Sequence, residues 1–461
     1  MNKQTSRASC LPSDRIPWRM ALITLLCAAF LPEYIAPVFT LSTFLVFKRY
    51  FSQTKQKARI GTVGKVFLVY MCYMMISFLW SDTKIFSILV PLLWMGMFLG
   101  DIFLSNLIDR RERLRQAMFF LTIGAAAVSV VALLQMLCIK LKIPFPIPFW
   151  KDVDHFIFKF LPFSIVTDFV STRVSATFDN PLILAAYLII ILPVSIYSLF
   201  ELKEKWQRIT AGVCVLLIFG GIAATYSRGA YLAVIVMLVV LMFLGKKQAV
   251  GIAALFAGIL LILPQSVYQR LFAILQLDVS TVTRLAIWGG CLKVFTENPL
   301  FGVGAGTENV TNLLQNRFGI NQPHAHSLYF ELLRLRAALS AFCFCRRAEP
   351  AGLRFVLPTA KRSEMAEDGR CLPCLPAGFL VFSVFEFSLQ TPKELQYFML
   401  FLGLVEASNG FAKNLWQSRT YRLSLWKKRR LPLKKNPLHR QDLFDRNYSV
   451  VIFAMNPLWL L

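Results

Sequence analysis

The sequence alternates apolar blocks of membrane-spanning length with short clusters of basic residues. An α-helix rises about 1.5 Å per residue, so about 20 apolar residues cross the roughly 30 Å hydrocarbon layer of a bilayer. Apolar residues make up 56% of the 461 residues, charged residues make up 16%, and the mean hydropathy is +0.57. A soluble domain is much less apolar. The pattern predicts an all-α polytopic membrane protein with about 12 transmembrane helices and a large external loop before the penultimate group of helices.

The formal net charge of +25 has two interpretations. In a soluble protein it would favour nucleic-acid binding, but no recognition module accompanies the basic residues here. They lie between the apolar blocks, where lysine and arginine hold loops on the cytoplasmic side of a membrane. The charge therefore predicts topology, and we expect no nucleic-acid partner.

The basic clusters also orient the predicted helices. The most basic loops are residues 48–65, 110–115 and 203–208, which the positive-inside rule assigns to the cytoplasm. The first apolar stretch, residues 20–47, is interrupted by Pro32 and Glu33, and this break favours a hairpin of two short helices. Both termini are then predicted to be cytoplasmic, and segments 140–181 and 264–326 are predicted to be external.

These apolar and basic segments divide the chain into consecutive parts. We expect a cytoplasmic N-terminus, a group of transmembrane helices, the large external loop, one further transmembrane helix, an anomalous Arg- and Cys-rich segment, a second group of transmembrane helices and a basic cytoplasmic tail. The corresponding residues are 1–19, 20–263, 264–326, 327–345, 346–376, 377–408 and 409–461.

The Arg- and Cys-rich segment departs from the helical apolar pattern. Residues 334–370 contain seven Arg and one Lys, and four cysteines lie in or near this stretch: Cys343, Cys345, Cys371 and Cys374. Four thiolates can close a tetrahedral zinc site, but a single residue between the first two is unfavourable spacing for it. A basic cytoplasmic loop is favoured. A disturbed reading frame of the gene is the remaining explanation, because the composition changes abruptly and then changes back.

Two arginines lie near the predicted external ends of apolar blocks. Arg173 precedes a helix that we expect to begin at Pro181, with Asp179 and Asn180 as its caps. Arg228 lies between two predicted spans, in a connection too short for a solvated loop. Such a side chain either snorkels to lipid phosphates or binds a phosphate or diphosphate ligand.

A third arginine belongs to the large external loop. Arg284 and Trp288 are one helical turn apart, so they share a face. The alternating Gly302, Gly304 and Gly306 follow. No strand precedes these glycines and no P-loop lysine follows them, which disfavours a nucleotide-binding loop. They indicate a backbone that bends closely around a neighbour.

Two histidines, His324 and His326, directly precede the next apolar block. One residue separates them, which raises the question of metal binding, but the external segments offer no obvious cluster of further His or Cys ligands. A single catalytic base is the favoured interpretation, because an imidazole with a reference pKa near 6.5 accepts a hydroxyl proton at neutral pH. We therefore expect no metal and no cofactor.

In this order, these residues resemble the O-antigen ligase and polysaccharide polymerase superfamily of bacterial membrane transferases. The matching segments are 173–181, 227–229, 284–288, 298–306 and 324–327. The resemblance extends over roughly residues 20–333 and resumes weakly over roughly 377–408. Each motif alone is weak, and the specificity comes from the ordered set on one membrane face.

The resemblance implies a metal-independent glycosyltransferase of the bacterial cytoplasmic (inner) membrane. It implies transfer of a saccharide from undecaprenyl diphosphate to an acceptor hydroxyl on the outer face. The implied partners are the lipid-linked glycan, a saccharide or lipid acceptor and membrane lipids. By resemblance, His326 is the catalytic base, and Arg228 and Arg284 bind the donor diphosphate. His324 is the second candidate for the base, and Arg173 assists at the sugar or the phosphate.

The chain departs from the family pattern after the histidines. Family members follow the His-Ser or His-Asn pair with a span that carries a Gly-x-x-Gly turn, and residues 337–340 here read Ala-Ala-Leu-Ser. The main alternative function is a transporter or flippase of a lipid-linked saccharide, which would also place arginines along the path of a diphosphate. It is less favoured, because no clear internal repeat is seen and the candidate residues lie at one face. A non-enzymatic scaffold is the third interpretation.

Overall fold

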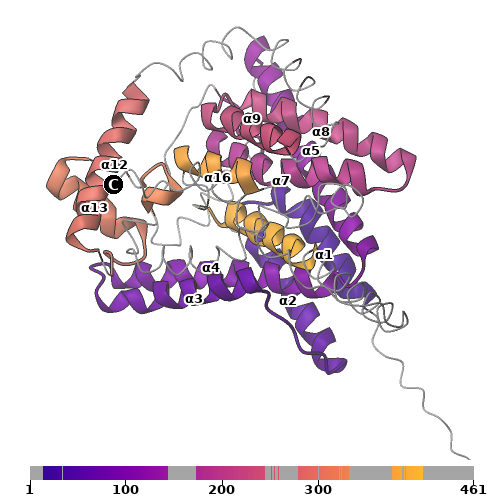
Figure 1. Ribbon diagram of the computed structural model, residues 1–461, viewed down its shortest axis with the longest axis horizontal. Coiled ribbons are helices and arrows are strands. Elements are labelled where there is room, and N and C mark those ends of the chain that lie inside the picture. Colours follow the sequence, from indigo (N-terminus) through magenta and orange to yellow (C-terminus); the bar gives the residue numbers. More distant parts are fainter. Residues whose placement is uncertain are drawn as a thin grey trace, which may run out of the picture. The chain divides into compact units, whose positions relative to one another are not determined.

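The computed structural model describes the chain in the ranges 14–33, 35–143, 173–243, 279–299, 301–320, 324–331, 376–386 and 391–408, together with residues 251, 254, 258, 322 and 389. All of them belong to one compact unit, residues 1–412. These described residues are largely helical and include no strand (Figure 1). The prediction of an all-α protein is confirmed.

The described residues form a series of α-helices and two short 3₁₀ helices. In chain order they are α1 (Arg15–Cys27), η1 (Ala28–Phe30), α2 (Ala36–Gln53), α3 (Thr62–Ile76), η2 (Ser77–Leu79), α4 (Lys84–Leu107), α5 (Arg111–Leu141), α7 (Pro181–Glu201), α8 (Lys205–Ala224), α9 (Arg228–Phe243), α12 (Val279–Glu297), α13 (Thr307–Phe318) and α16 (Pro376–Phe385). Residues 328–331 and 392–408 are also helical.

Five helical segments are long and apolar enough to cross a membrane: α3 with η2, α4, α5, α7 and α8. All five lie within residues 20–263, where the sequence predicts a group of transmembrane helices, and α9 is a shorter apolar helix. Apolar side chains such as Val69 and Ile85 are 57% and 62% exposed, as expected for helices that face lipid. These helices indicate a multi-pass membrane protein, whereas the total of about 12 spans stays a prediction.

The most enclosed helix is α7, which packs against α5, α8, α9 and α16. Residues 184–198 are all buried, because this helix is apolar on every face. Asn180 is its N-cap, and the Asn180 side chain accepts a hydrogen bond of 2.8 Å from the Leu182 amide. Pro181 is the first helical residue, where its missing N–H costs nothing. The predicted helix start is confirmed, with Asn180 as the cap.

A buried ion pair joins the break between α1 and α2 to a helix far along the chain. The Lys393 amide donates a 2.7 Å hydrogen bond to Glu33 Oε1, and Lys393 Nζ lies 3.9 Å from Glu33 Oε2. Lys393 Nζ also donates to the Thr177 carbonyl at 2.8 Å. Thr177 Oγ1 in turn donates to the Ala29 carbonyl at 2.7 Å. These contacts hold the segment that leads into α7.

Burial raises the pKa of Glu33 to about 7, the nearby Lys393 ammonium lowers it, and the charge of Asp179 raises it. Glu33 lies between helices and not within a spanning segment. Because its folded-state pKa exceeds the ordinary value of 4.5, the folded protein binds more protons than the unfolded chain between these values. The contribution of Glu33 to stability is therefore greatest below about pH 4.5 and is lost as the pH rises through about 7.

We predict that Glu33→Gln flattens the pH dependence of stability. The amide oxygen still accepts from Lys393 but does not titrate. The thermal unfolding midpoint of the parent protein in detergent should fall between pH 5 and pH 8, and that of the variant should fall less. Asp82→Asn, which removes an exposed carboxyl, is the control and should follow the parent. Equal slopes for all three proteins would contradict this role of Glu33.

Candidate functional site

The loop before α13 is docked on the turn between α3 and α4. The Ala305 amide donates to Ser77 Oγ at 2.9 Å, and its carbonyl accepts from Ser87 Oγ at 2.5 Å. Gly304 has φ +96°, and a Cβ there would lie 2.7 Å from Ser81 Cβ. Only glycine combines this conformation with this close approach. The alternating glycines thus bend closely around a neighbour, as the sequence indicates.

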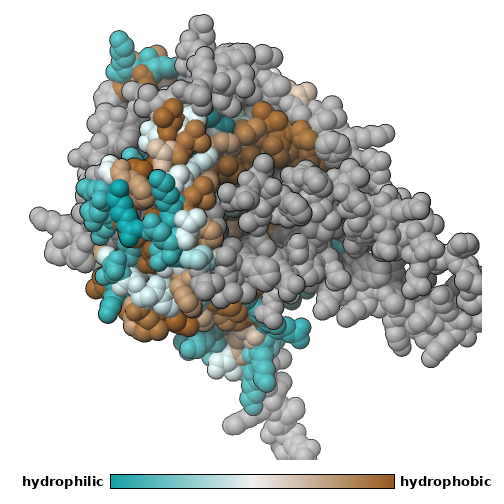
Figure 2. All heavy atoms as spheres, turned by 60° about the vertical axis from the view of Figure 1, so that its left-hand side comes forward, coloured by the Kyte–Doolittle hydropathy of each residue, from teal (hydrophilic) through white to brown (hydrophobic). Residues whose placement is uncertain are grey.

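A small separate core supports the residues around the histidines. Ile287 and Cys291 of α12, Leu314 of α13 and Ala325 are buried together. The opposite side of α13 is polar and exposed, including Arg317, which pairs with Glu297. Figure 2, which brings the α12 and α13 side of Figure 1 forward, shows hydrophilic side chains gathered next to hydrophobic ones. Ala325 is held in place because it packs into the small core formed by α12 and α13.

One face of α12 contacts two other parts of the site. Arg284 Nη1 donates to the Phe385 carbonyl at the end of α16, and Nη2 donates to Glu386 Oε1, both at 2.6 Å. One turn later, Trp288 Nε1 donates to the Ala325 carbonyl at 2.9 Å. The shared face predicted for Arg284 and Trp288 thus joins α16 to the loop that carries the histidines.

The peptide groups on both sides of Ala325 are fixed. Its carbonyl accepts from Trp288, and its amide donates to Glu331 Oε2 at 3.0 Å. Trp288 also stacks on Phe330, with ring centroids 4.9 Å apart. The next residue, His326, has φ +49°, a left-handed conformation that is uncommon for a residue other than glycine. Such strain persists only where surrounding contacts enforce it, and it is often found at functional sites.

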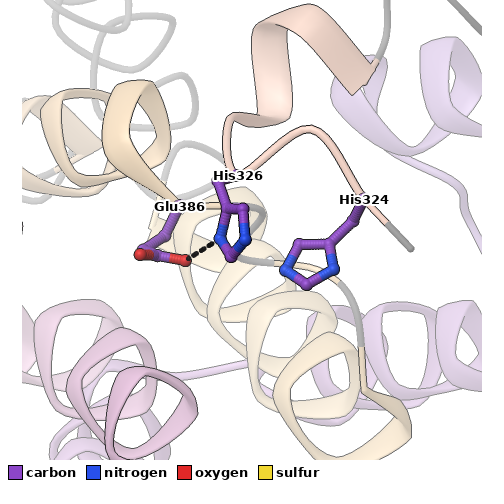
Figure 3. Close-up of side chains that lie close together, drawn as sticks. All are labelled: His324, His326 and Glu386. Atoms are coloured by element: carbon purple, nitrogen blue, oxygen red, sulfur yellow. Dashed lines mark ion pairs between the residues drawn. The ribbon is translucent and has the colours of Figure 1, made fainter. Parts of the chain in front are cut away.

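His326 lies between Glu386 and His324 in Figure 3. His326 Nδ1 is 3.5 Å from Glu386 Oε2, while Glu386 Oε1 is held by Arg284. The rings of His324 and His326 are tilted against each other, with centroids 4.2 Å apart. Each of the three side chains places a ligand atom within 4.8 Å of the others, a donor set that could hold a metal ion. A single carboxylate thus contacts both a guanidinium and an imidazole.

An electropositive cavity of about 100 Å³ adjoins this carboxylate. Its lining residues are Arg173, Leu182, Tyr226, Ser227, Arg228, Gly229, Arg284, Phe385 and Glu386. Three arginines and one glutamate thus line the same cavity. Arg173 donates to the Thr225 carbonyl through Nε at 3.0 Å and Nη2 at 2.7 Å. The first turns of α7 and α9 also border the cavity, and helix N-termini attract negative charge. The cavity is suited to an anion.

The structure brings most of the predicted site residues together. Arg173, Arg228 and Arg284 line one cavity, although they come from three separate segments. His326 is not among the lining residues, but Glu386, which it contacts, is one of them. His324 lies against His326. The four cysteines of the zinc interpretation and residues 337–340 lie outside the described residues.

Sequence reasoning missed Glu386, which lies 102 residues after Arg284. Its one local signal is an acidic residue within an otherwise apolar block, a feature that often marks function in membrane proteins. Nothing local indicates which arginine or histidine it contacts.

Residues 213–334 match the family model described as O-antigen ligase. This segment is similar to the O-antigen ligase family. The predicted resemblance to the O-antigen ligase and polysaccharide polymerase superfamily is confirmed. No curated protein matches the sequence at a significant level.

The O-antigen ligase segment contains Arg228, Arg284, His324 and His326, whereas Arg173 lies before it and α16 lies after it. The match is therefore narrower than the resemblance seen in the sequence. The family supports a membrane glycan transferase of the O-antigen ligase kind, with glycosyltransferase-type activity on lipid-linked glycans.

We predict that Trp288→Phe loosens the histidine loop without unfolding α12. Phenylalanine keeps an aromatic ring against Phe330 but cannot donate to the Ala325 carbonyl, and a hydrogen bond of this kind contributes about 1 kcal/mol. Amide hydrogen exchange in peptides spanning 322–331 should become about fivefold faster. Trp206→Phe on α8 is the matched control and should leave these peptides unchanged. Unaltered exchange in Trp288→Phe would show that the hydrogen bond does not hold the loop.

Proposed function

We propose that this protein transfers a saccharide from an undecaprenyl diphosphate carrier to an acceptor hydroxyl at the outer face of the bacterial cytoplasmic membrane, without a metal or another cofactor in the reaction. The observation that carries this proposal is the cavity lined by three arginines, bordered by the contact between Glu386 and His326. The family of residues 213–334 supports the reaction class.

The cavity supplies the groups that a diphosphate donor needs. A guanidinium offers a planar fork of N–H donors that matches two phosphate oxygens. Arg228 is the first residue of α9, so the partial positive charge of the helix N-terminus adds to its own charge. Arg284 is oriented by Phe385 and Glu386. When the glycosidic bond breaks, the departing diphosphate gains negative charge, which Arg228 and Arg284 stabilise.

His326 is the proposed base. As the acceptor oxygen attacks the anomeric carbon, its proton passes to His326 Nε2, and the bond between that carbon and the diphosphate breaks. With Nδ1 directed at Glu386, the imidazolium formed in this step is stabilised by a carboxylate at 3.5 Å. This contact favours His326 over His324. Arg173, which is tied to Thr225, assists at the sugar or the phosphate.

Helix direction supports the outer-face location. The helix α7 runs from the cavity, at Pro181, to the short connection of residues 202–204, which contains Lys203 and is followed by Lys205 and Arg208 in the first turn of α8. The basic loop that carries Arg59 contacts the C-terminal end of α4, just before the basic residues 110–115. The Arg59 amide donates to Asn106 Oδ1 at 2.8 Å, and Asn106 Nδ2 donates to the Arg59 carbonyl at 2.8 Å. Lysine- and arginine-rich loops remain cytoplasmic, so the opposite end of α7 faces outward.

We predict that His326→Ala and Arg284→Gln abolish surface glycan display in cells that lack the gene, whereas the unaltered chain restores it. Loss of a general base lowers transfer by a factor of about 100 or more. The measurement is the glycan pattern on a gel at matched amounts of membrane-inserted protein. His439→Ala and Arg317→Gln are the matched controls, which change a histidine and an arginine that the proposal does not use, and both should restore display. Full restoration by His326→Ala and Arg284→Gln would overturn the assignment of base and diphosphate-binding residues.

The proposed orientation gives a separate prediction. In a chain without native cysteines, a cysteine at exposed Arg317 should react with a membrane-impermeant maleimide in intact spheroplasts. A cysteine at Lys57 should react only after the membrane is permeabilised, because its loop is assigned to the cytoplasm. Labelling in the reverse pattern would invert the topology.

A further inference from the structure

We infer that His324, His326 and Glu386 form a binding site for a divalent transition-metal ion of the zinc type, and that occupancy of this site excludes the base role of His326. The second half of this inference rests on the proposed function. The binding site itself does not, because it depends only on the arrangement of the three side chains.

The geometry is close to that of a tetrahedral site. With metal–ligand bonds of about 2.0 Å, two ligand atoms in such a site are about 3.3 Å apart. His326 Nδ1 and Glu386 Oε2 are already 3.5 Å apart. A nitrogen of His324 completes a set whose members all lie within 4.8 Å of one another. His324 and His326 share one short loop, and their rings lie side by side with centroids 4.2 Å apart (Figure 3).

The donor atoms suit the same class of ion. Two imidazoles and one carboxylate are ligands that Zn²⁺ prefers, whereas Mg²⁺ and Ca²⁺ favour oxygen ligands alone. His326 Nδ1 is a buried atom with no hydrogen-bond partner in the described part of the chain. Glu386 Oε1 is fixed by Arg284, which leaves Oε2 directed at His326. Supporting contacts of this kind orient metal ligands and strengthen binding.

The site is partly exposed, so an ion can reach it. The His326 side chain is 23% exposed, although the Glu386 side chain is only 9% exposed. Three protein ligands leave the fourth tetrahedral position for water. The positive charge of Arg284 repels a bound metal ion, but the negative charge of its partner Glu386 offsets this repulsion. These features favour a reversible site over a closed structural one.

Metal binding and base catalysis compete for the same imidazole. A neutral imidazole has one N–H and one lone pair. When the Nδ1 lone pair binds the metal, the proton resides on Nε2, which then cannot accept the proton of the acceptor hydroxyl. When Nδ1 carries the proton and faces Glu386, Nε2 is the acceptor. Zinc should therefore inhibit transfer, and its removal should restore it.

The sequence alone does not predict this metal site, because one of its three ligands is far from the two histidines in the chain. The third ligand, Glu386, is neither a histidine nor a cysteine and lies beyond the Arg- and Cys-rich stretch. Only the contact of Glu386 with Arg284 and His326 places it beside the histidine pair.

Binding can be tested on the full chain, purified in detergent, stripped with a chelator and titrated with Zn²⁺ in equilibrium dialysis. We expect one ion per chain, with affinity reduced about tenfold or more in His324→Ala and in Glu386→Gln. Glu386→Gln retains a side-chain oxygen for Arg284, so it tests the ligand without removing that contact. His155→Ala and His439→Ala are the histidine controls and should bind as the parent does. A four-coordinate Co²⁺ spectrum, lost in the same two variants, is the second readout. Absence of binding, or equal binding by all variants, would overturn the site.

The inhibitory effect is tested in a second experiment, in which glycan display or glycan transfer is measured first with Zn²⁺ and then after a chelator is added. Transfer that falls with Zn²⁺ and recovers with chelator supports the exclusion. Stoichiometric binding without any effect on transfer would overturn the exclusion and leave the site in place. Metal binding by a chain that transfers no glycan under any condition would overturn the proposed function alone.

Discussion

The Glu386 carboxylate connects the parts of the site that the chain supplies from distant positions. Its two oxygens contact Arg284 on α12 and His326 on the histidine loop. Glu386 follows α16, and α16 packs against α7 and α9, whose N-terminal turns border the cavity. Glu386 and α16 therefore hold the arginine guanidinium groups, the His326 imidazole and the two helix N-termini in fixed positions relative to one another. A displacement of α16 would separate the proposed base from the arginines at the same time.

The membrane explains where these polar groups lie. Backbone groups inside hydrocarbon must be paired internally, so spanning segments are helices and irregular backbone gathers at their ends. In this protein the polar contacts follow that rule. Arg173 binds the Thr225 carbonyl just after α8, and Arg284 binds the Phe385 carbonyl at the end of α16. The lysine and carboxylate of the Glu33 pair are similarly placed beside helix ends. The requirement that backbone groups be paired inside the membrane thus also places these charged groups together near one end of α7.

The sequence predicts local features well, but it does not predict which distant residues meet in the folded protein. The lengths of the apolar blocks indicate the five long spans, and the Asn-Pro pair indicates the start of α7, because these signals depend on neighbouring residues. The convergence of Arg173, Arg228 and Arg284 followed only from resemblance. Glu386 stands out only as an acidic residue in an apolar block. The sequence does not indicate the partner of Glu386 or of Lys393, because Arg284 and Glu33 lie about one hundred residues or more away from them. Tertiary packing, and not local pattern, determines such pairs.

We assign donor binding to the arginines and proton transfer to His326. Measuring donor binding separately from transfer tests this division most directly. The measurement is the equilibrium affinity of purified protein for an undecaprenyl diphosphate glycan. We predict that His326→Ala binds the donor as the parent does although it transfers nothing, while Arg284→Gln binds at least about tenfold more weakly. Parent-like donor binding by Arg284→Gln, or an equal loss of binding in both variants, would contradict it.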